Sequence, residues 1–234
     1  MRRVKARLLA FWQNAGWNEI AFLGGIMTVC LGVWLFLAVA GWAAHESFQQ
    51  VEEHWMRALR NPADPSDLIG PWWVEELARD VSALGSAVVV VMLSVFVTGF
   101  LLLRGYCGRA ALVSITVLGG YLLSHTLKST YSRVRPDVVP HLTEVSSASF
   151  PSGHSMVSSL VYLTLGALLA QTTPRRREKL YVLAAAAGLT GLIGISRVAL
   201  GVHYPTDVVA GWSAGTAWAA ACLLIAWKWQ RTRL

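Results

Sequence analysis

Charged residues are scarce in this chain. Only 14% of its 234 residues are Asp, Glu, Lys or Arg, whereas 55% are hydrophobic. Soluble domains carry about 25% charged residues, so this composition argues against a soluble fold. A lipid bilayer is the solvent that such a chain fits.

Cysteine is scarce too. Cys30 and Cys222 lie inside apolar runs and Cys107 lies in a short basic turn, so the three cysteines indicate neither a disulfide framework nor redox chemistry. The sequence shows no internal repeat and no low-complexity tract. We therefore expect a single membrane-embedded domain over residues 1–234.

What the chain does have is a series of long apolar runs. Runs of about 18 or more uncharged apolar residues predict transmembrane helices. Residues 20–44, 84–103, 110–127 and 208–227 meet this length, and the shorter apolar runs 155–170 and 180–195 bring the number of predicted spans to six. The first run is too long for the apolar part of a signal peptide, and no cleavage site follows it. The sequence thus predicts an all-α polytopic membrane protein with six transmembrane helices.

Lysine and arginine are distributed unevenly between the two sides that six spans define. Thirteen of the 20 lie on the side of the termini, beginning with Arg2, Arg3, Lys5 and Arg7, whereas only two of the 13 acidic residues do. Because cytoplasmic segments hold the excess of basic residues, both termini are expected in the cytoplasm. Topology and anionic lipids also explain the net charge of +7, so no nucleic-acid partner is indicated.

The longest polar segment, residues 45–83, lies between the first two spans and is extracytoplasmic in this topology. Its residues 46–59 are expected to form an amphipathic helix with apolar side chains at three- and four-residue spacing. Those side chains are Phe48, Val51, Trp55 and Leu59. Trp72 and Trp73 are typical of residues that anchor a protein at a membrane interface.

The remaining polar clusters all fall at the outer ends of predicted spans. They are Lys128, Arg135 and Pro136 after the third span, Pro151, Ser152, Gly153 and His154 at the start of the fourth, and Ser196, Arg197, His203 and Asp207 between the fifth and sixth. Three segments that are distant in sequence are thus expected to meet at one depth in the membrane.

Three cations in these clusters, Lys128, Arg135 and Arg197, are costly near a membrane unless they are paired with anions. A phosphate group meets that need, because arginine offers a planar fork to its oxygens and lysine a point charge. Ser152 and Gly153 stand where a helix begins, so their backbone N–H groups are expected to hold another phosphate oxygen.

His203 and Asp207 are four residues apart, near a helix that Pro205 is expected to start. A carboxylate that binds one imidazole nitrogen leaves the other free to attack, which describes a nucleophilic histidine. His154 is then suited to protonate the leaving oxygen and to activate water afterwards. Any one of these residues alone would more often be an interfacial or snorkelling side chain; the pattern of all three clusters favours phosphoryl transfer.

These clusters resemble the three-part signature of the type 2 phosphatidic acid phosphatase family. KSTYSRVRP (residues 128–136), PSGH (151–154) and SRVALGVHYPTD (196–207) are similar to its three motifs in order, and ARDVSALGS (78–86) is similar to a stretch before the second span of bacterial members. The resemblance covers the chain from roughly the second span onward.

The resemblance implies a six-helix membrane phosphatase that works without a metal or other cofactor through a phosphohistidine. By that resemblance His203 is the nucleophile, Asp207 its orienting partner and His154 the general acid. The phosphate ligands it implies are Lys128, Arg135, Ser152, Gly153, Arg197 and Ser196. The expected setting is a bacterial inner membrane, with the site facing the periplasm or exterior and no obligate protein partner.

Several functions remain open at this point. Polyprenyl diphosphate, phosphatidylglycerophosphate, phosphatidate and lipid A phosphate all fit an outward-facing site. A lipid-to-lipid phosphotransferase using the same residues is the main alternative. A transporter or scaffold would not need His203, Asp207 and His154 together. The vanadium-dependent haloperoxidases have similar motifs, but they are soluble proteins, whereas the composition of this chain fits a membrane.

Overall fold

The structure is a computed structural model that describes residues 17–231. Within that range every regular element is a helix, which confirms the all-α prediction. The helices are α2 (Trp17–Ala43), α3 (Glu46–Ala58), α4 (Trp73–Ala83), α5 (Ala87–Leu103), α6 (Cys107–Tyr131), α7 (Gly153–Thr172), α8 (Arg176–Ala199) and α9 (Pro205–Arg231). The basic residues Arg2, Arg3, Lys5 and Arg7, used to orient the chain, lie outside the described residues.

Five helices, α2 and α6 to α9, are long and apolar enough to cross a membrane. The remaining predicted span corresponds to α5, which follows α4 across a bend of 44°. The 17 residues of α5 extend over about 26 Å at 1.5 Å per residue. The prediction of six spans agrees with the fold when α4 and α5 are counted as one bent span.

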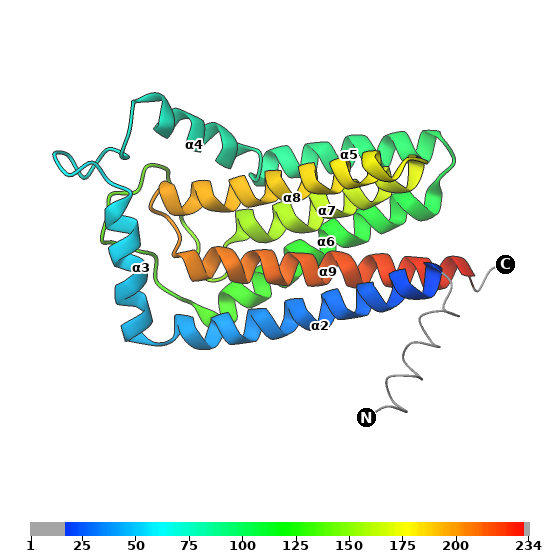
Figure 1. Cartoon of the computed structure of the whole chain (residues 1–234), viewed down its shortest axis with the longest axis horizontal. Helices are drawn as coiled ribbons and strands as arrows, with labels where there is room; N and C mark the ends of the chain where they lie inside the picture. Colours follow the sequence, from blue (N-terminus) through cyan, green and yellow to red (C-terminus); the bar gives the residue numbers. More distant parts are fainter. Residues whose placement is uncertain (1–16, 232–234) are drawn as a thin grey trace.

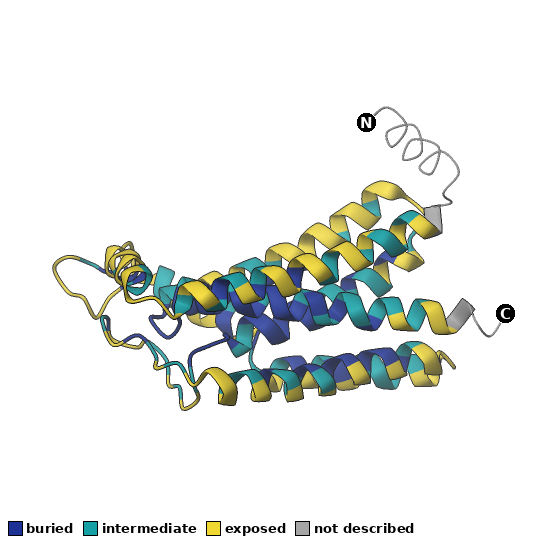
Figure 2. Cartoon of the chain, turned by 90° about the horizontal axis from the view of Figure 1, so that it is seen from below, coloured by how far each residue is buried: buried dark blue, intermediate teal, exposed yellow. Residues whose placement is uncertain are grey.

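The helices expose much of their outer surface (Figure 2), and many of the exposed side chains are large and hydrophobic. Trp34, Phe96 and Leu118, on three different helices, are 62%, 69% and 71% exposed. In water such a surface would drive aggregation, whereas in a bilayer it contacts lipid chains. The burial pattern therefore agrees with a protein that spans a membrane.

The helices pack around α7, which contacts α6, α8 and α9, while α2 lies along α9 (Figure 1). Two glycines set the approach of α7 and α9. A Cβ atom at Gly211 would lie 2.6 Å from the carbonyl oxygen of Ser152, and one at Gly215 only 1.9 Å from Ser159 Oγ. Small residues four positions apart let helices approach this closely. Because Asp207 lies one turn before Gly211, this contact brings the second and third motifs together.

The link between α8 and α9 turns at Gly201, whose φ of +79° favours glycine. A Cβ atom there would lie 2.5 Å from Arg60 Nη2. Arg60 is 4% exposed and donates through Nη2 to the carbonyl oxygen of Pro140 at 3.1 Å. Residues 45–83, called the outer segment below, are thus packed against the loop after α6 and the α8–α9 link at this end of the bundle.

Helix α3 confirms the helix predicted over residues 46–59, and the structure shows which of its residues are buried. Val51 and Trp55 are 44% and 53% exposed, whereas Glu52 and Met56 are 0% and 1% exposed. Val51 and Trp55 therefore point outward, where a membrane interface would receive them, and the Glu52 carboxylate points into the protein together with Met56.

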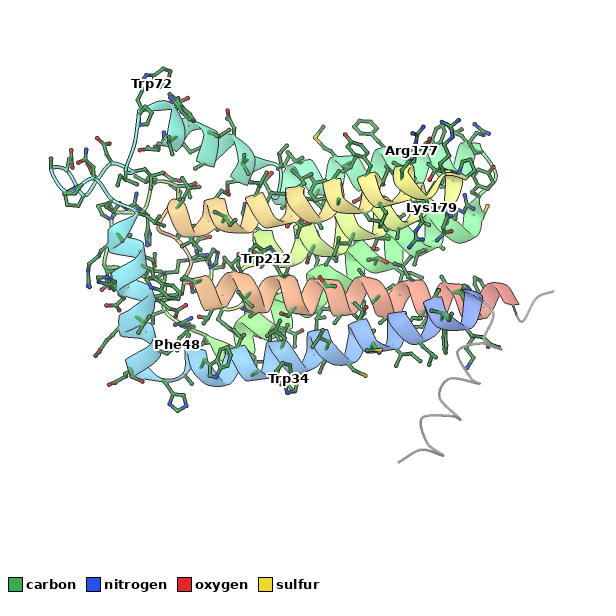
Figure 3. All side chains as sticks on the ribbon, viewed as in Figure 1. Trp34, Phe48, Trp72, Arg177, Lys179 and Trp212 are labelled. Carbon is green, nitrogen blue, oxygen red and sulfur yellow. The ribbon has the colours of Figure 1, made fainter. Side chains whose placement is uncertain are left out.

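Figure 3 places Trp72 and Phe48 at the end of the bundle that carries α3 and α4, and Arg177 and Lys179 at the opposite end. Helix α2 begins, and α9 ends, at the end that carries Arg177 and Lys179 (Figure 1). Arg177 and Lys179 thus lie at the end where α2 begins and α9 ends, the side to which the sequence assigns the excess of basic residues.

Candidate active site

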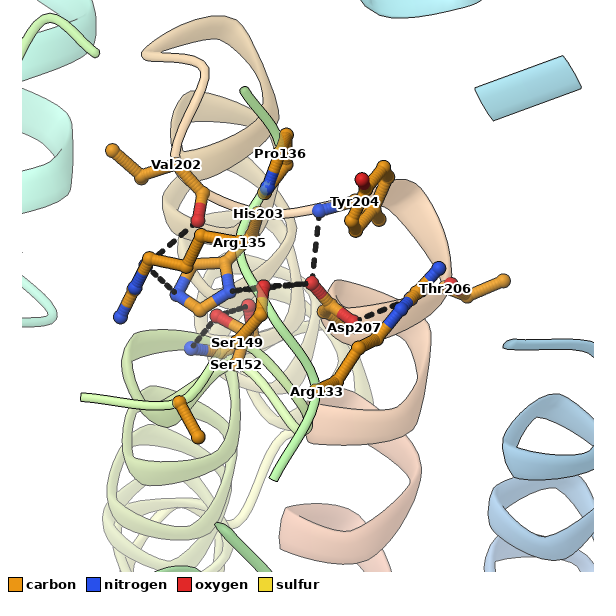
Figure 4. Close-up of polar contacts among 12 residues, drawn as sticks. Arg133, Arg135, Pro136, Ser149, Ser152, Val202, His203, Tyr204, Thr206 and Asp207 are labelled. Carbon is orange, nitrogen blue, oxygen red and sulfur yellow. Dashed lines mark hydrogen bonds and ion pairs between the residues drawn. The ribbon is translucent and has the colours of Figure 1, made fainter. Parts of the chain in front are cut away.

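The polar clusters predicted from the sequence meet at the end of the bundle that carries α3 and α4 (Figure 4). Lys128 lies in the last turn of α6, and Arg135 lies in the extended segment that follows it. Ser152 caps α7, Arg197 lies in the last turn of α8, and Asp207 lies in the first turn of α9. Four helix ends therefore converge on one site.

His203 lies in the buried link between α8 and α9 and is 1% exposed. Arg135 Nη1 lies 3.3 Å from His203 Nε2. Because a guanidinium can only donate, Nε2 carries the lone pair and Nδ1 carries the proton. Nδ1 lies 3.3 Å from Ser149 Oγ and 3.5 Å from Asp207 Oδ2. The ring therefore has the tautomer and orientation that a nucleophile at Nε2 needs.

Asp207 is fully buried and both of its carboxylate oxygens accept hydrogen bonds. Oδ2 accepts from the hydroxyl of Ser149 at 2.5 Å and from the N–H of Tyr204 at 2.9 Å, and Oδ1 accepts from Arg133 Nη1 at 2.7 Å. Its distance of 3.5 Å to His203 Nδ1 is longer than the 3.3 Å that separates Ser149 Oγ from the same nitrogen. Ser149 thus bridges the carboxylate and the imidazole.

Burial lowers the pKa of His203 to about 4, although the hydrogen bond and charge of Asp207 act to raise it. The charges of Arg135 and Arg197 act in the same direction as burial. The ring is therefore neutral at physiological pH, and its lone pair is available for attack.

Two of the predicted phosphate-binding cations are held by backbone carbonyl groups. Arg135 donates to the carbonyl oxygens of Ser147 at 2.8 Å and Val202 at 2.7 Å. Lys128 Nζ donates to the carbonyl oxygen of Ala148 at 2.5 Å. These bonds fix each side chain without neutralising its charge.

The third cation, Arg197, is 4% exposed and donates from Nη1 to Ser82 Oγ on α4 at 2.7 Å. Its Nε is buried and has no hydrogen-bond partner within residues 17–231. Neither Lys128, Arg135 nor Arg197 forms an ion pair with any residue that the structure describes. Three such cations beside His203 form a site that fits an anion with the charge of a phosphate group.

The start of α7 partly departs from expectation. Ser152 Oγ accepts from the N–H of Ser155 at 3.4 Å as a helix cap, but the N–H of Ser152 donates to the carbonyl oxygen of Asp207 at 2.9 Å. That N–H is therefore not available to a phosphate oxygen. The N–H of Gly153 has no acceptor within its own helix, because it belongs to the first turn. Gly153 also leaves room for Lys128, whose Cε would lie 3.4 Å from a Cβ atom there.

His154, in the first turn of α7, faces a cavity of about 260 Å³ that is also lined by Lys128 and Gly153. The rest of its lining is largely apolar and comes from α5, α6 and α7. His154 thus shares this cavity with Lys128, one of the three cations.

The hydroxyl of Ser196, by contrast, does not donate into the site. Its hydroxyl donates to the carbonyl oxygen of Ile193 in its own helix at 2.7 Å. Of the predicted phosphate ligands, Ser196 is the one whose hydroxyl proton is already engaged.

Four residues of the site were missed by sequence reasoning: Glu52, Ser82, Arg133 and Ser149. Ser82 lies in the ARDVSALGS stretch and Arg133 inside the first motif, so a signal was present for both. Ser149 stands just before the second motif. Glu52 had no signal, because an acidic residue in an amphipathic helix is usually solvated.

Comparison with known proteins agrees with this geometry. The PAP2 superfamily model matches residues 108–231, which include all three motifs. Phosphatidylglycerophosphatase B of Bacillus subtilis is 34% identical over 151 residues, which are 63% of this chain and 73% of that protein. Lipid A 1-phosphatase of Rhizobium etli is 27% identical over 168 residues, covering 62% of this chain and 68% of that protein.

A solved structure shows the same fold. The crystal structure of a transmembrane PAP2 type phosphatidylglycerolphosphate phosphatase from Bacillus subtilis superimposes with a TM-score of 0.73 at 30% identity. The match covers 86% of this chain and 96% of that one.

Proposed function

The chain belongs to the PAP2 superfamily, and from that premise we propose that it removes a phosphate group from a membrane lipid through a phosphohistidine at His203. One observation carries the proposal. His203 Nε2 lies 3.3 Å from Arg135 Nη1, at the edge of a cluster of three cations that form no ion pair with the described residues. A phosphate bound by that cluster would lie within reach of the lone pair.

In the first step, the lone pair of His203 Nε2 attacks phosphorus and the bond between phosphorus and the lipid oxygen breaks. Lys128, Arg135 and Arg197 stabilise the charge on the equatorial oxygens. His154 donates a proton to the departing oxygen. The positive charge that His203 gains is balanced by Asp207, directly and through Ser149.

In the second step, His154 accepts a proton from a water molecule as its oxygen attacks phosphorus. The bond between phosphorus and Nε2 then breaks, and inorganic phosphate leaves. His203 returns to its neutral form, which burial favours. Each histidine thus ends the cycle in the state in which it began.

A lipid substrate is supported by the walls of the site. The cavity beside His154 shares Tyr121 with an apolar cavity of about 420 Å³ between α5 and α6. Val95 and Leu118, which line this second cavity, are among the outward-facing side chains of the bundle. An acyl or prenyl chain lying along α5 and α6 would place its phosphate beside Lys128 and His154 without leaving the membrane.

We assign the site to the outer face of a bacterial inner membrane, with both termini in the cytoplasm. The support is the predominance of lysine and arginine at the opposite end of the helices. Single cysteines in the loops, labelled in intact cells with an impermeant reagent, test the assignment. Labelling near Asn61 and protection near Arg176 are expected, and the reverse pattern would invert the topology.

The function is tested by phosphate release from detergent-purified protein in the presence of a chelator. The panel consists of polyprenyl diphosphate, phosphatidylglycerophosphate, phosphatidate and lipid A, with glycerol phosphate as a water-soluble comparison. We expect release from at least one lipid without an acceptor lipid, and none from folded His203→Ala. The matched variant His54→Ala, at an exposed histidine on α3, should keep the wild-type rate.

Two outcomes would count against the proposal. Hydrolysis by His203→Ala at the wild-type rate would exclude the nucleophile. Phosphate loss from the donor only when a second lipid is present would identify a phosphotransferase instead.

A further inference from the structure

The carboxylate that α3 buries reaches the catalytic centre through a single arginine. Glu52 Oε2 accepts from Arg133 Nη2 at 3.1 Å, and Glu52 Oε1 accepts from the N–H of Thr206 at 2.7 Å. Helix α3 belongs to the outer segment, 154 residues before Thr206 in the chain. One side chain of the outer segment therefore binds both the loop after α6 and the start of α9.

Arg133 connects Glu52 to the catalytic carboxylate. Its Nη1 donates to Asp207 Oδ1 at 2.7 Å and to Thr206 Oγ1 at 2.8 Å, and its guanidinium lies 4.1 Å from the centre of the Tyr204 ring. Figure 4 shows it approaching Asp207 from the side away from the His203 ring. Arg133 thus differs from the phosphate-binding cations, because its partners are carboxylates.

Glu52 and Asp207 share this one arginine, and both are fully buried. Because Glu52 engages Nη2, Arg133 offers only Nη1 to Asp207. A single arginine can bind a carboxylate with two parallel hydrogen bonds, and without Glu52 it would be free to do so. That arrangement would withdraw Asp207 Oδ2 from His203 and neutralise the charge that supports the phosphohistidine.

Glu52 also caps α9. Pro205 begins that helix and has no N–H, so the N–H of Thr206 is the first donor at its positive end. A carboxylate from α3 satisfies this donor. The position of the first turn of α9, which carries Asp207, therefore depends on Glu52 in two ways.

We propose that Glu52 is a positioning residue for the catalytic histidine, acting through Arg133 and Asp207. The inference rests on the proposed function, since it assigns Glu52 to the orientation of the nucleophile. It gives the outer segment a part in catalysis that is separate from substrate binding. Glu52 is not among the residues that line the cavity beside His154. Its cationic partner is Arg133 and not one of the three predicted phosphate-binding cations Lys128, Arg135 and Arg197.

The test is Glu52→Gln, which keeps the shape of the side chain and an acceptor for Thr206 but removes the charge. We expect kcat to fall about 10- to 100-fold, the effect of losing a hydrogen bond to a charged group. KM should stay within about twofold, because no phosphate ligand moves. Glu53→Gln is the matched control: Glu53 contacts Gln49 and Arg57 of its own helix, and its variant should retain wild-type kcat and KM.

A merely structural role for Glu52 would give a different pattern. It would lower Tm and the active fraction together, while the protein that remained folded kept the wild-type kcat. If Glu52→Gln alone fails to fold, the pair Glu52→Gln and Arg133→Gln removes the unpaired buried cation. The pair should fold and show the loss in kcat.

Three results would overturn the inference: wild-type kcat in folded Glu52→Gln, a loss confined to KM, or wild-type kcat in the folded pair. Failure of the proposed function is distinguishable, because the wild-type protein itself would then release no phosphate.

Discussion

Ser149 bridges His203 and Asp207, and a single substitution can test whether this bridge supports catalysis. The two side chains are 3.5 Å apart, and Ser149 Oγ lies 2.5 Å from Asp207 Oδ2 and 3.3 Å from His203 Nδ1. Ser149→Ala removes the bridge without adding volume. A hydrogen bond to a charged group contributes about 1.5–3 kcal/mol, which corresponds to a rate factor of roughly 10 to 150.

Part of this loss should be recovered, because the imidazole can move towards Asp207 and close the direct contact. We therefore expect kcat to fall about 10- to 30-fold, the lower part of that range, with little change in KM. The assay is initial phosphate release from the best lipid of the panel, normalised to folded protein. Ser158→Ala is the matched control, because Ser158 is equally buried and its hydroxyl donates only to the backbone of Ser155. Wild-type kcat in folded Ser149→Ala would refute the bridging role.

Two further predictions follow from the site. Ser82→Ala removes the hydroxyl that accepts a hydrogen bond from Arg197. Losing this bond should weaken substrate binding by about 0.5–1.5 kcal/mol and so raise KM about 2- to 10-fold. An unchanged KM in steady-state assays would exclude a role of Ser82 in orienting Arg197. His203 has its pKa lowered to about 4, so nitrogen NMR of labelled protein should show a neutral ring at pH 5.5, where an ordinary histidine is about nine-tenths protonated. A charged ring at that pH would contradict the buried environment described for it.

The helices of the bundle could be predicted because a bilayer imposes long apolar runs, and the residues at their outer ends indicated one site. The bend between α4 and α5 was not predicted. The sequence shows that the apolar run begins after the charged residues Arg79 and Asp80 of α4, but it does not show that Ser86 Oγ accepts from the N–H of Val89 at 3.3 Å and so begins a new helix. A single cap of this kind does not interrupt an apolar pattern.

Burial within α3 could not be predicted from amphipathicity. The pattern grouped Val51 and Trp55 on one apolar side of the helix but did not indicate whether that side faces the protein or the membrane interface. The structure turns them outward and buries Glu52, because Arg133 and the N–H of Thr206 satisfy its carboxylate. Arg133 and Thr206 lie more than 80 residues from Glu52 in the chain, so no local sequence pattern predicts these contacts.

The chemistry at the start of α7 shows the same limit. Residue types alone indicated that the N–H of Ser152 would be free for phosphate. The close contact at Gly211 instead brings the carbonyl oxygen of Asp207 within 2.9 Å of it. Residue identity thus predicted which side chains gather, whereas helix packing determines which of their donors remain available.

The central claim is that phosphate passes through His203. Rapid acid-free quenching of a reaction with a lipid labelled in its phosphate, followed by digestion under alkaline conditions, tests it directly. We expect the label on the peptide that contains His203, and more of it in His154→Ala, which lacks the group that activates water. Label on another residue, or none in a variant that still consumes substrate, would contradict the account.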